Sequence, residues 1–478
     1  MQFFLVPSKT QYSSNISIKN LIIVLSCFGC MIYLVCSIYL APNNTSHFHT
    51  SVSLQDDNLS SQTNLDHIVF GIASNELSWS KRKEYVKLWW QPNMMRGCVF
   101  LEKMPPSSSN GTKDESLPPI CISGDTSNFR YTYKGGTPSA IRVARVVSET
   151  VALNHSNVRW FVFGDDDTIF FPENLVKTLS KYDHGLWYYI GTNSESFTQN
   201  KFFSYEMAFG GAGFAISYPL ANVLARVFDS CIERYPHLYG SDGRVHACLA
   251  ELGVGLTREP GFHQMDFHGN VFGLLAAHPN RPLVSMHHME AIDPIFPTMT
   301  TVKALEHLYN AANFDPHRIL QQTVCYDRWF SWTVSVSWGY AVQVFDKHVP
   351  LPNVERVEES YAPWKRSHTG GLYDFDSRKY ESDPCRRQLV YFLDRISSET
   401  NRTKAIYKRK TSEECKFNMS SPRRLEEIRV LSSKLVLEKQ QLLAPRRHCC
   451  DVLTSTWGNV MEIGIRECKE DELIYLLH

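Results

Sequence analysis

The sequence predicts an α/β fold with a mostly parallel sheet flanked by helices, preceded by a transmembrane helix and followed by a smaller C-terminal region that contains β-strands. Two observations support the sheet. From residue 65 onward, short apolar runs alternate with amphipathic segments, as in strands joined by crossover helices. One apolar run, residues 160–164, leads directly into three consecutive aspartates. Because α/β proteins bind ligands at the carboxyl ends of their strands, this order indicates a functional site.

The composition is that of a globular protein with balanced charge. Among 478 residues, 49 are Lys or Arg and 49 are Asp or Glu, and 43% are hydrophobic. A chain of this length is large enough to form two hydrophobic cores. It has no surplus of basic residues to contact a polyanion, so we expect no nucleic-acid partner.

Residues 21–40 predict a membrane anchor. They are uncharged, and a helix of this length extends about 30 Å, which matches the hydrocarbon core of a bilayer. Lys9 and Lys19 precede the segment, whereas the next basic residue is Lys81, so the positive-inside rule places residues 1–20 in the cytosol as a short tail. The alternative is a cleaved signal peptide, but its apolar stretch is normally shorter and ends at small residues, which residues 38–42 do not provide.

The rest of the chain is then expected on the lumenal side. Residues 41–64 are polar and predict a stem. Of the 13 cysteines, the ten that follow the anchor are an even number, which is compatible with disulfides in an oxidising compartment. Cys231 and Cys248 are candidates for one such pair. Asn-x-Ser/Thr triplets, which are glycosylated only on the lumenal side, begin at Asn43, Asn44, Asn58, Asn110, Asn154, Asn401 and Asn418.

Hydrophobic periodicity predicts each element of residues 65–324 in turn. Short runs rich in aromatic and β-branched residues predict strands, and apolar residues at helical spacing, such as Ile141, Ala144 and Val147, predict helices. Strands are expected at 68–72, 99–101, 120–122, 160–164 and 186–190, and helices at 81–90, 139–153, 172–182, 219–234 and 245–252.

Residues 325–478 predict an accessory region with more β-structure. Trp332, Val334, Val336 and Trp338 alternate as in a half-buried strand. Residues 425–443 suggest a helix, and Cys449, Cys450 and Cys468 are candidates for disulfides that hold the C-terminal tail.

The acidic triplet itself predicts a metal site. Three carboxylates at the end of a buried strand repel one another strongly unless a cation lies among them. Oxygen ligands beside an open face suit Mg²⁺ or Mn²⁺ that carries a phosphate-bearing substrate. Asp165, Asp166 and Asp167 also fit a polar turn before the helix that begins near Pro172, but the order of strand, triplet and helix favours the ligand site.

Three motifs in order resemble a known family. The end of the strand at 160–167, Tyr-Ile-Gly at 189–191 and Phe-Gly-Gly-Ala-Gly-Phe-Ala-Ile-Ser at 209–217 resemble the fringe-like β-1,3-glycosyltransferases of glycosyltransferase family 31, and most of all a plant group catalogued as a domain of unknown function (DUF604). The resemblance covers roughly residues 65–290. It implies a GT-A fold for residues 65–324, a UDP-sugar donor, a Mn²⁺ or Mg²⁺ ion, and inverting transfer of a hexose to a glycan or glycoprotein acceptor. A short tail, one span, a stem and a transferase domain resemble Golgi residents, so we expect a single-pass type II protein of the Golgi membrane.

The same resemblance implies roles for the aspartates. Asp167 corresponds to the direct metal ligand, and Asp165 and Asp166 help to hold the ion or the donor ribose. Asp242 corresponds to the catalytic base, which takes the proton of the acceptor hydroxyl. Ser241 stands where the family often has a second acidic residue. From the residues alone, Asp242 is also a candidate N-cap for the helix at 245–252.

Two further predictions complete the site. The glycine-rich residues 210–213 predict a close approach of backbone to the donor sugar at Gly211 and Gly213, although a strand of small residues fits equally well. His263 is the candidate for the remaining protein ligand of the ion. The alternatives for the same role are Asp266, His268, His287 and His288.

Two other classes of protein remain open. A strand that ends in Asp-x-Asp also describes metal-dependent phosphohydrolases with an aspartyl nucleophile. Those enzymes usually carry the motif on the first strand and have Thr or Val where this chain has Ile169. A non-catalytic carbohydrate-binding protein that keeps the same fold is the other alternative.

Overall fold

The computed structural model describes residues 25–32, 62–105, 114–365, 371–399, 401–409, 415–416, 420–453 and 458–474. The chain divides into two compact units, Met1–Ser61 and Gln62–His478. In the first unit, residues 25–32 are helical and exposed. Within the described ranges, no helix has both the length and the apolar character needed to cross a membrane. The remainder of the predicted anchor, residues 21–24 and 33–40, and the stem up to residue 61 lie outside the described residues.

The second unit begins with a seven-stranded sheet. Its strands are β1 (Ile68–Ala73), β2 (Arg96–Leu101), β3 (Ile120–Ile122), β4 (Trp160–Asp165), β6 (Tyr189–Gly191), β7 (Phe214–Ser217) and β8 (Leu256–Arg258). They are arranged in the order β3-β2-β1-β4-β7-β6-β8. Only β7 runs antiparallel to its neighbours, β4 and β6, and the other neighbouring pairs are parallel. The prediction of an α/β fold with a mostly parallel sheet is confirmed.

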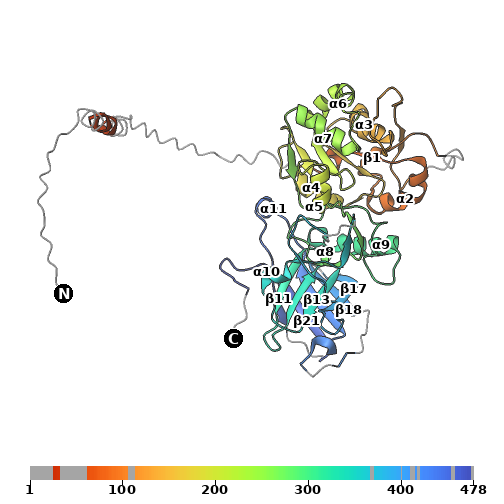
Figure 1. Ribbon diagram of the computed structural model, residues 1–478. Coiled ribbons are helices and arrows are strands. Elements are labelled where there is room, and N and C mark those ends of the chain that lie inside the picture. The colour runs from red at the N-terminus through yellow and green to blue at the C-terminus, as the bar shows by residue number, and fades with distance from the viewer. Residues whose placement is uncertain are drawn as a thin grey trace, which may run out of the picture. The chain divides into compact units, whose positions relative to one another are not determined.

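Helices cover both faces of this sheet (Figure 1). They are α2 (Glu76–Trp89), α3 (Ser139–Ala152), α4 (Pro172–Leu179), α5 (Phe197–Phe202), α6 (Tyr218–Ile232) and α7 (Ser241–Glu251). Side chains of α3, α6 and α7 pack on one face of the sheet around Phe161 and Phe163. Side chains of α2 and α4 pack on the other face around Trp160 and Val162. Alternate residues of β4 therefore serve the two cores.

The helix α2 begins earlier than the sequence predicts, because Asn75 caps it. The Asn75 side chain accepts hydrogen bonds from the backbone of Leu77 and Ser78, which satisfies two donors that a helix start leaves unpaired. The predicted helix at 81–90 is correct in kind but misses this first turn. The first turn carries Ser78, which contacts the acidic triplet.

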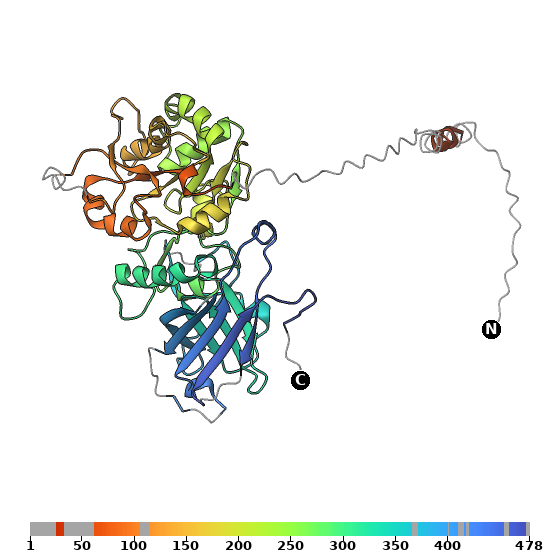
Figure 2. The same cartoon turned by 180° about the vertical axis from the view of Figure 1, so that it is seen from behind.

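An eight-stranded sheet makes up most of the C-terminal region (Figure 2). Its strands are β11 (Gln322–Tyr326), β12 (Thr333–Ser337), β13 (Ala341–Phe345), β17 (Leu389–Glu399), β18 (Arg402–Arg409), β19 (Glu427–Ser433), β20 (Cys449–Leu453) and β21 (Val460–Arg466). Their order is β11-β12-β13-β17-β18-β19-β21-β20, and only β19 and β21 pair in parallel. The prediction of β-structure beyond residue 325 is confirmed. The predicted boundary at that residue falls inside β11.

The helix predicted at 425–443 is wrong. Its first part forms β19, which lies between β18 and β21 and buries Ile428 and Val430 while Arg429 stays partly exposed. This two-residue alternation is the period of a strand. Only α11 (Lys439–Leu443) is helical there.

Short elements connect the two sheets. They are β5 (Ile169–Phe170), β9 (Phe267–Gly269), α8 (Phe272–Ala276), β10 (Ser285–Met286), α9 (Thr301–Phe314), α10 (Leu351–Val354), β14 (Val357–Glu358), β15 (Tyr361–Pro363) and β16 (Ser377–Arg378). On α9, Tyr309 stacks on Phe171 with ring centroids 4.9 Å apart, and its hydroxyl donates to the Phe170 carbonyl. One hydrophobic cluster extends from Tyr85 to Ile465, so the two sheets share a core.

Disulfides join all ten cysteines of the second unit. The pairs are Cys98–Cys121, Cys231–Cys248, Cys325–Cys450, Cys385–Cys415 and Cys449–Cys468. The predicted pair Cys231–Cys248 is confirmed, and it links α6 to α7. The pair Cys449–Cys468 holds the C-terminal tail against the second sheet, as the sequence suggests, whereas Cys325–Cys450 joins β11 to β20, the first and last strands in the order of that sheet.

Candidate metal centre

The acidic triplet lies where β4 ends beside β1. The parallel register places Ala73 next to Asp165, so Ser74 and the start of α2 lie alongside the turn. Thr168 closes that turn, because its backbone N–H donates to the Asp165 carbonyl over 3.1 Å and its hydroxyl accepts from the Asp165 N–H over 2.7 Å. The three carboxylates therefore leave a tight turn in different directions.

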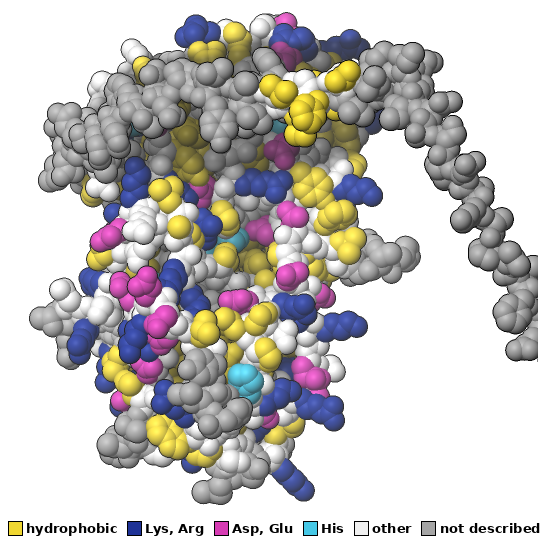
Figure 3. Space-filling view, turned by 90° about the vertical axis from the view of Figure 1, so that its left-hand side faces the viewer, with side chains coloured by type: hydrophobic (Ala, Val, Ile, Leu, Met, Phe, Trp, Pro, Cys, Tyr) yellow, Lys and Arg dark blue, Asp and Glu magenta, His cyan; other side chains and the backbone are white. Residues whose placement is uncertain are grey.

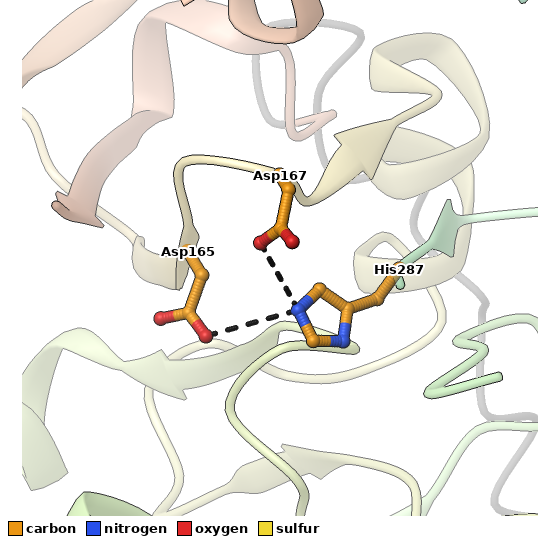
Figure 4. A group of neighbouring side chains, drawn as sticks. All are labelled: Asp165, Asp167 and His287. Atoms are coloured by element: carbon orange, nitrogen blue, oxygen red, sulfur yellow. Dashed lines mark hydrogen bonds and ion pairs between the residues drawn. The ribbon is translucent and has the colours of Figure 1, made fainter. Parts of the chain in front are cut away.

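Asp165 and Asp167 meet a histidine from a distant part of the chain (Figure 4). The His287 Nε2 atom lies 3.1 Å from Asp167 Oδ1 and 3.9 Å from Asp165 Oδ2. One ligand atom from each of the three residues lies within 4.8 Å of the other two. Two carboxylates and an imidazole are a donor set that suits Mn²⁺ or Mg²⁺ with positions left for substrate.

A short strand pair brings His287 to this place. The strand β5 directly follows the triplet, and β10 directly precedes His287. The two strands pair antiparallel, with Ile169 opposite Met286. The Ser285 hydroxyl also donates to the Ala212 carbonyl. The ligand cluster is therefore assembled by contacts between segments about a hundred residues apart in sequence.

Charges in the cluster are strongly coupled. Burial raises the pKa of Asp165 to about 7, and Asp167, Asp242 and Asp166 add to this effect although His287 opposes it. Burial also acts to raise the pKa of Asp167, but His287 and Arg82 outweigh it and lower that pKa to about 2. Asp167 in turn raises the pKa of His287 against the effect of burial. A raised pKa at Asp165 and the neighbouring Arg82 both reduce the repulsion among these carboxylates, and the site fits a divalent ion in addition to the arginine.

Asp166 is turned away from the cluster. Its Oδ2 accepts hydrogen bonds from the hydroxyls of Ser74 and Ser78, at 2.6 Å and 2.5 Å, and its Oδ1 accepts from Arg82 at 3.1 Å. Asp166 is not among the three residues that could hold an ion together, and its predicted contact with the donor ribose stays a prediction. Its carboxylate holds Arg82 and the first turn of α2 instead.

Arg82 places a permanent positive charge beside the site. The same guanidinium nitrogen that contacts Asp166 lies 3.1 Å from Asp167 Oδ2, and a second nitrogen lies 2.7 Å from Glu290 Oε2. Arg82 keeps 29% of its side chain exposed. Three carboxylates thus fix its position while it remains open to solvent.

Residues 210–213, Gly-Gly-Ala-Gly, form a glycine turn that lies against both His287 and Asp242. The Gly213 N–H donates to the Gly210 carbonyl over 2.9 Å, so the alternative of a strand made of small residues is wrong before Phe214. A Cβ atom at Gly211 would lie 2.1 Å from His287 Cε1, and one at Gly210 would lie 2.5 Å from Asp242 Oδ1. Gly213 has a φ of +83° and faces Phe170. The glycines make room for protein side chains on both sides of the turn.

Asp242 lies in the first turn of α7, and Gly240 is the N-cap, so the N-cap alternative for Asp242 is wrong. Burial raises the pKa of Asp242, and Asp266 adds to this, although hydrogen bonds from the Gly210 backbone and from Ser241 oppose it. The Ser241 hydroxyl donates to Asp242 Oδ1 over 3.0 Å. A carboxylate with a raised pKa is suited to accept a proton near neutral pH.

Residues 199–450, more than half of the chain, match the family described as "Protein of unknown function, DUF604". The chain belongs to the DUF604 family. Its matched segment contains Asp242, the glycine turn and His287, whereas the acidic triplet precedes it.

Several solved glycosyltransferases share a distant likeness with this DUF604 protein. The galactosyltransferase LgtC in complex with donor and acceptor sugar analogs has 11% identity and a TM-score of 0.31, over 50% of this chain and 94% of that one. A glycosyltransferase involved in the glycosylation of the major capsid of PBCV-1 has 11% identity and a TM-score of 0.27, over 50% and 97%. A mannosyltransferase from Pyrobaculum calidifontis, in complex with GDP-Man and Mn²⁺, has 11% identity and a TM-score of 0.26, over 54% and 72%. At such TM-scores we draw no conclusion from these likenesses.

The histidine predicted as a ligand, His263, lies elsewhere in the DUF604 protein. Its Nδ1 is 3.1 Å from Glu195 Oε1 and its Nε2 is 3.0 Å from His278 Nε2. Burial, followed by the charge of His263, lowers the pKa of His278 to about 3, so His278 is neutral and donates from Nδ1 to the Pro279 carbonyl. His278 Nε2 must then accept from His263. Both ring nitrogens of His263 are engaged by protein groups, so His263 is not part of the cluster, and His287, one of the alternatives, lies beside Asp165 and Asp167 instead.

The segment around His263 nevertheless supports the site. Gln264 Oε1 accepts from the N–H of Ala212 in the glycine turn over 2.8 Å. The Met265 N–H donates to Glu195 Oε2 over 2.9 Å. Asp266 Oδ1 lies 3.2 Å from His288 Nδ1, next to the ligand. The sequence therefore led to a segment that positions the ligands, but not to the ligand itself.

An aromatic side chain from the C-terminal region borders the cluster. The strand β15 pairs with β9 and is followed by Trp364. The imidazoles of His288 and His268 stack on this indole, with centroids 4.4 Å and 4.7 Å away. The C-terminal region thus contributes to the surroundings of the candidate metal centre.

Sequence reasoning missed Arg82 completely. It lies in a run of Lys, Arg and Lys on an amphipathic helix, which normally indicates a solvated face. His287 was among the alternative ligands. The sequence indicates it only weakly, by two adjacent histidines that follow a short apolar run. Only the pairing of β5 with β10 distinguishes it from the other histidines.

Proposed function

We propose that this protein is an inverting glycosyltransferase that moves a hexose from a UDP-sugar to a hydroxyl group of a glycan or glycoprotein, in a β-1,3 linkage, with a divalent metal ion. The observation that supports it is the meeting of Asp165, Asp167 and His287 at the carboxyl end of β4, with Asp242 across the glycine turn. The resemblance to fringe-like transferases supplies the donor and the linkage.

Asp165, Asp167 and His287 would hold the ion. When bound there, Mn²⁺ or Mg²⁺ supplies the positive charge that stabilises the departing diphosphate. Arg82 is fixed beside Asp167 and adds a second positive charge at the same edge. Asp166 holds that arginine in place, which gives the middle aspartate a positioning role.

Asp242 would act as the base. The acceptor hydroxyl oxygen attacks the anomeric carbon, its proton passes to the Asp242 carboxylate, and the bond to the diphosphate oxygen breaks so that UDP leaves. The raised pKa of Asp242 supports this role. The glycine turn that contacts His287 also contacts the Asp242 carboxylate, which supports a base close to the proposed ion.

Calorimetry with residues 62–478 tests the proposal. We expect UDP to bind in the presence of Mn²⁺ and to lose most of that affinity with chelator or in the variants Asp167→Asn and His287→Gln. His263→Gln is the matched control, because this histidine lies outside the cluster, and it should keep metal-assisted binding. UDP binding that is unchanged by chelator, or lost only in the His263 variant, would contradict the proposed site.

A substrate panel separates the alternatives. We expect metal-dependent consumption of a UDP-sugar and no turnover of p-nitrophenyl phosphate. Turnover of the phosphomonoester alone would favour the phosphohydrolase. Binding of UDP-sugars without any turnover, to sugar or to water, would favour the non-catalytic carbohydrate-binding protein.

We also propose that the protein is anchored in the Golgi membrane by residues 21–40, with the second unit in the lumen. The five disulfides of that unit support an oxidising compartment. Protease protection of a C-terminal tag in sealed microsomes tests the orientation. A tag that is digested without detergent would contradict it.

A further inference from the structure

An exposed aromatic cluster lies beside Asp242, outside the metal centre. Tyr239, three residues before Asp242, is 48% exposed. Its ring centroid lies 5.2 Å from that of Tyr133 and 5.9 Å from that of Phe203. We call Tyr133, Phe203 and Tyr239 the aromatic cluster.

The cluster extends inward to the glycine turn. Phe203 packs against Phe209 with centroids 6.0 Å apart, and Phe209 directly precedes Gly210. Gly210 in turn lies against the Asp242 carboxylate. The cluster is therefore linked to the candidate base both through these contacts and through the short segment from Tyr239 to Asp242.

Backbone hydrogen bonds hold Tyr239 in place. The Tyr131 hydroxyl donates to the Tyr239 carbonyl over 2.9 Å. The buried Arg244 donates to the carbonyls of Leu238 and Gly240, at 2.9 Å and 2.7 Å. Carbonyls of three successive residues are thus fixed, so little conformational entropy is lost when a ligand contacts the ring.

The chemistry of this surface suits a sugar. A pyranose has an apolar C–H face, which packs on an aromatic ring, and hydroxyl groups around its rim. Tyrosine offers an apolar ring together with a polar hydroxyl. Ser241 and Asp242, which follow Tyr239 closely, provide a hydroxyl and a carboxylate for the rim.

We propose that the aromatic cluster is the subsite for the acceptor saccharide, which stacks a pyranose ring on Tyr239, contacts Tyr133 at the edge of that ring, and directs one hydroxyl to Asp242. The inference rests on the proposed function, because it assigns the acceptor side of the same site. The acceptor subsite uses different residues from the metal centre, since no residue of the aromatic cluster contacts Asp165, Asp167 or His287.

Saturation-transfer NMR on residues 62–478, with UDP and Mn²⁺ present, tests the inference. The probes are the methyl β-pyranosides of glucose, galactose, mannose and N-acetylglucosamine. We expect at least one to bind the unaltered protein, Tyr239→Phe to bind it equally well, and Tyr239→Ala and Tyr133→Ala each to weaken it by about tenfold, because the ring is lost. Trp329→Ala is the control, since Trp329 is 64% exposed and belongs to the second sheet region.

The outcomes separate the two proposals. UDP affinity measured by calorimetry should be the same in all of these variants. If UDP binds with Mn²⁺ but no probe binds, or if both tyrosine-to-alanine variants bind the probe as the unaltered protein does, the acceptor subsite is overturned and the proposed function stands. If UDP itself fails to bind with Mn²⁺, the proposed function is overturned and the acceptor assignment with it.

Discussion

Asp165, Asp166 and Asp167 follow one another in sequence, but each carboxylate has different partners. Asp165 keeps 38% of its side chain exposed and has a raised pKa. Asp166 is held by two serines and an arginine, and Asp167 by Arg82 and His287. The turn thus gives three identical residues different surroundings, and only Asp165 and Asp167 face the candidate metal centre.

Removal of the Asp165 charge should abolish metal binding without lowering the stability of the metal-free protein. In the metal-free folded protein the pKa of Asp165 is about 7, which is higher than its pKa in the unfolded chain. The protonated carboxyl therefore contributes stability at low pH, and this contribution is lost as the pH rises to about 7. At pH 8 we therefore expect Asp165→Asn to unfold in chelator at the same temperature as the unaltered protein or higher, and to lose the rise in Tm that Mn²⁺ produces. A lower Tm in chelator, or a full response to Mn²⁺, would contradict the assignment.

The variant Asp242→Asn tests the base. The amide keeps the shape of the side chain but cannot take a proton, so we expect transfer to an acceptor to fall by about 100-fold or more. Metal-assisted UDP affinity should be unchanged, because Asp242 lies across the glycine turn from the ligands. Ser241→Ala is the control and should retain most of the transfer. Transfer at the normal rate in Asp242→Asn would reject the role.

The residues of the candidate site differ in how far the sequence predicts them. The triplet stands out because three carboxylates after an apolar run are locally unusual. Asp242 required a resemblance, since a single acidic residue near a helix start is also a common cap. His287 depends on the pairing of β5 with β10, and no local pattern specifies a contact between segments so far apart.

The glycine turn before β7 is the element on which both halves of the site depend. Gly210 faces Asp242 and Gly211 faces His287, so the backbone itself fills the space between base and ligand. Its carbonyl at Gly211 also accepts the Thr168 hydroxyl over 2.8 Å. The turn thereby connects the triplet, the histidine and α7.

The variant Gly211→Ala should damage the metal centre. The added methyl group would overlap the His287 ring, and overpacking of this kind costs about 1–3 kcal/mol of stability. We expect a lower Tm and a loss of metal-assisted UDP affinity, because the ring is displaced. Gly255→Ala is the matched control, since no atom lies within 4 Å of its added Cβ. Equal UDP affinity in both variants would show that the turn does not position His287.

Elements with clear periodicity were predicted well, and those decided by pairing were not. The helix α3 has a strongly amphipathic pattern, and its bounds agree closely with residues 139–153. The strand β19 carries charged residues on its exposed side, which imitate a solvated helix. It pairs with the preceding strand β18 on one side and with β21 on the other, and β20 lies between β19 and β21 in sequence.

The two sheets of the second unit depend on each other. The cluster that includes Tyr85 of α2 also includes Ile465 of β21, and Tyr309 of α9 contacts both Phe170 and Phe171 beside the triplet. Lys and Arg side chains are interspersed with Asp and Glu over the face that Figure 3 shows. Apolar packing therefore joins the two sheets.

Truncation tests this dependence. A chain that ends at residue 324 would expose the apolar residues that α9 and α8 pack against the second sheet, and it would lose Trp364 and β15 beside the candidate site. We expect residues 62–324 to lack a cooperative unfolding transition, whereas residues 62–478 unfold in a single transition by circular dichroism. A shorter chain that unfolds cooperatively and binds UDP with Mn²⁺ would show that the N-terminal sheet is autonomous.

The sequence predicted the order of α/β and β-rich parts but placed a domain boundary at residue 325. Composition does change there, because alternating strands replace crossover helices. The hydrophobic pattern of α9 shows that one face of the helix is buried, but it does not show which sheet covers that face. The packing between residues on the two sides of the boundary could therefore not be predicted. Shared packing is a property of the assembled fold.

The stacking of His288 and His268 on Trp364 gives the molecule an optical reporter. A protonated imidazole in van der Waals contact quenches indole fluorescence, and His288 adjoins His287 in the chain. Burial lowers the pKa of His288, and a cation in the neighbouring centre would lower this pKa further, so we expect acid quenching of the Trp364 emission to begin at a lower pH when the centre is loaded. Titrations of the native protein followed by fluorescence, with Trp364→Phe as the blank, would then follow occupancy without any added dye.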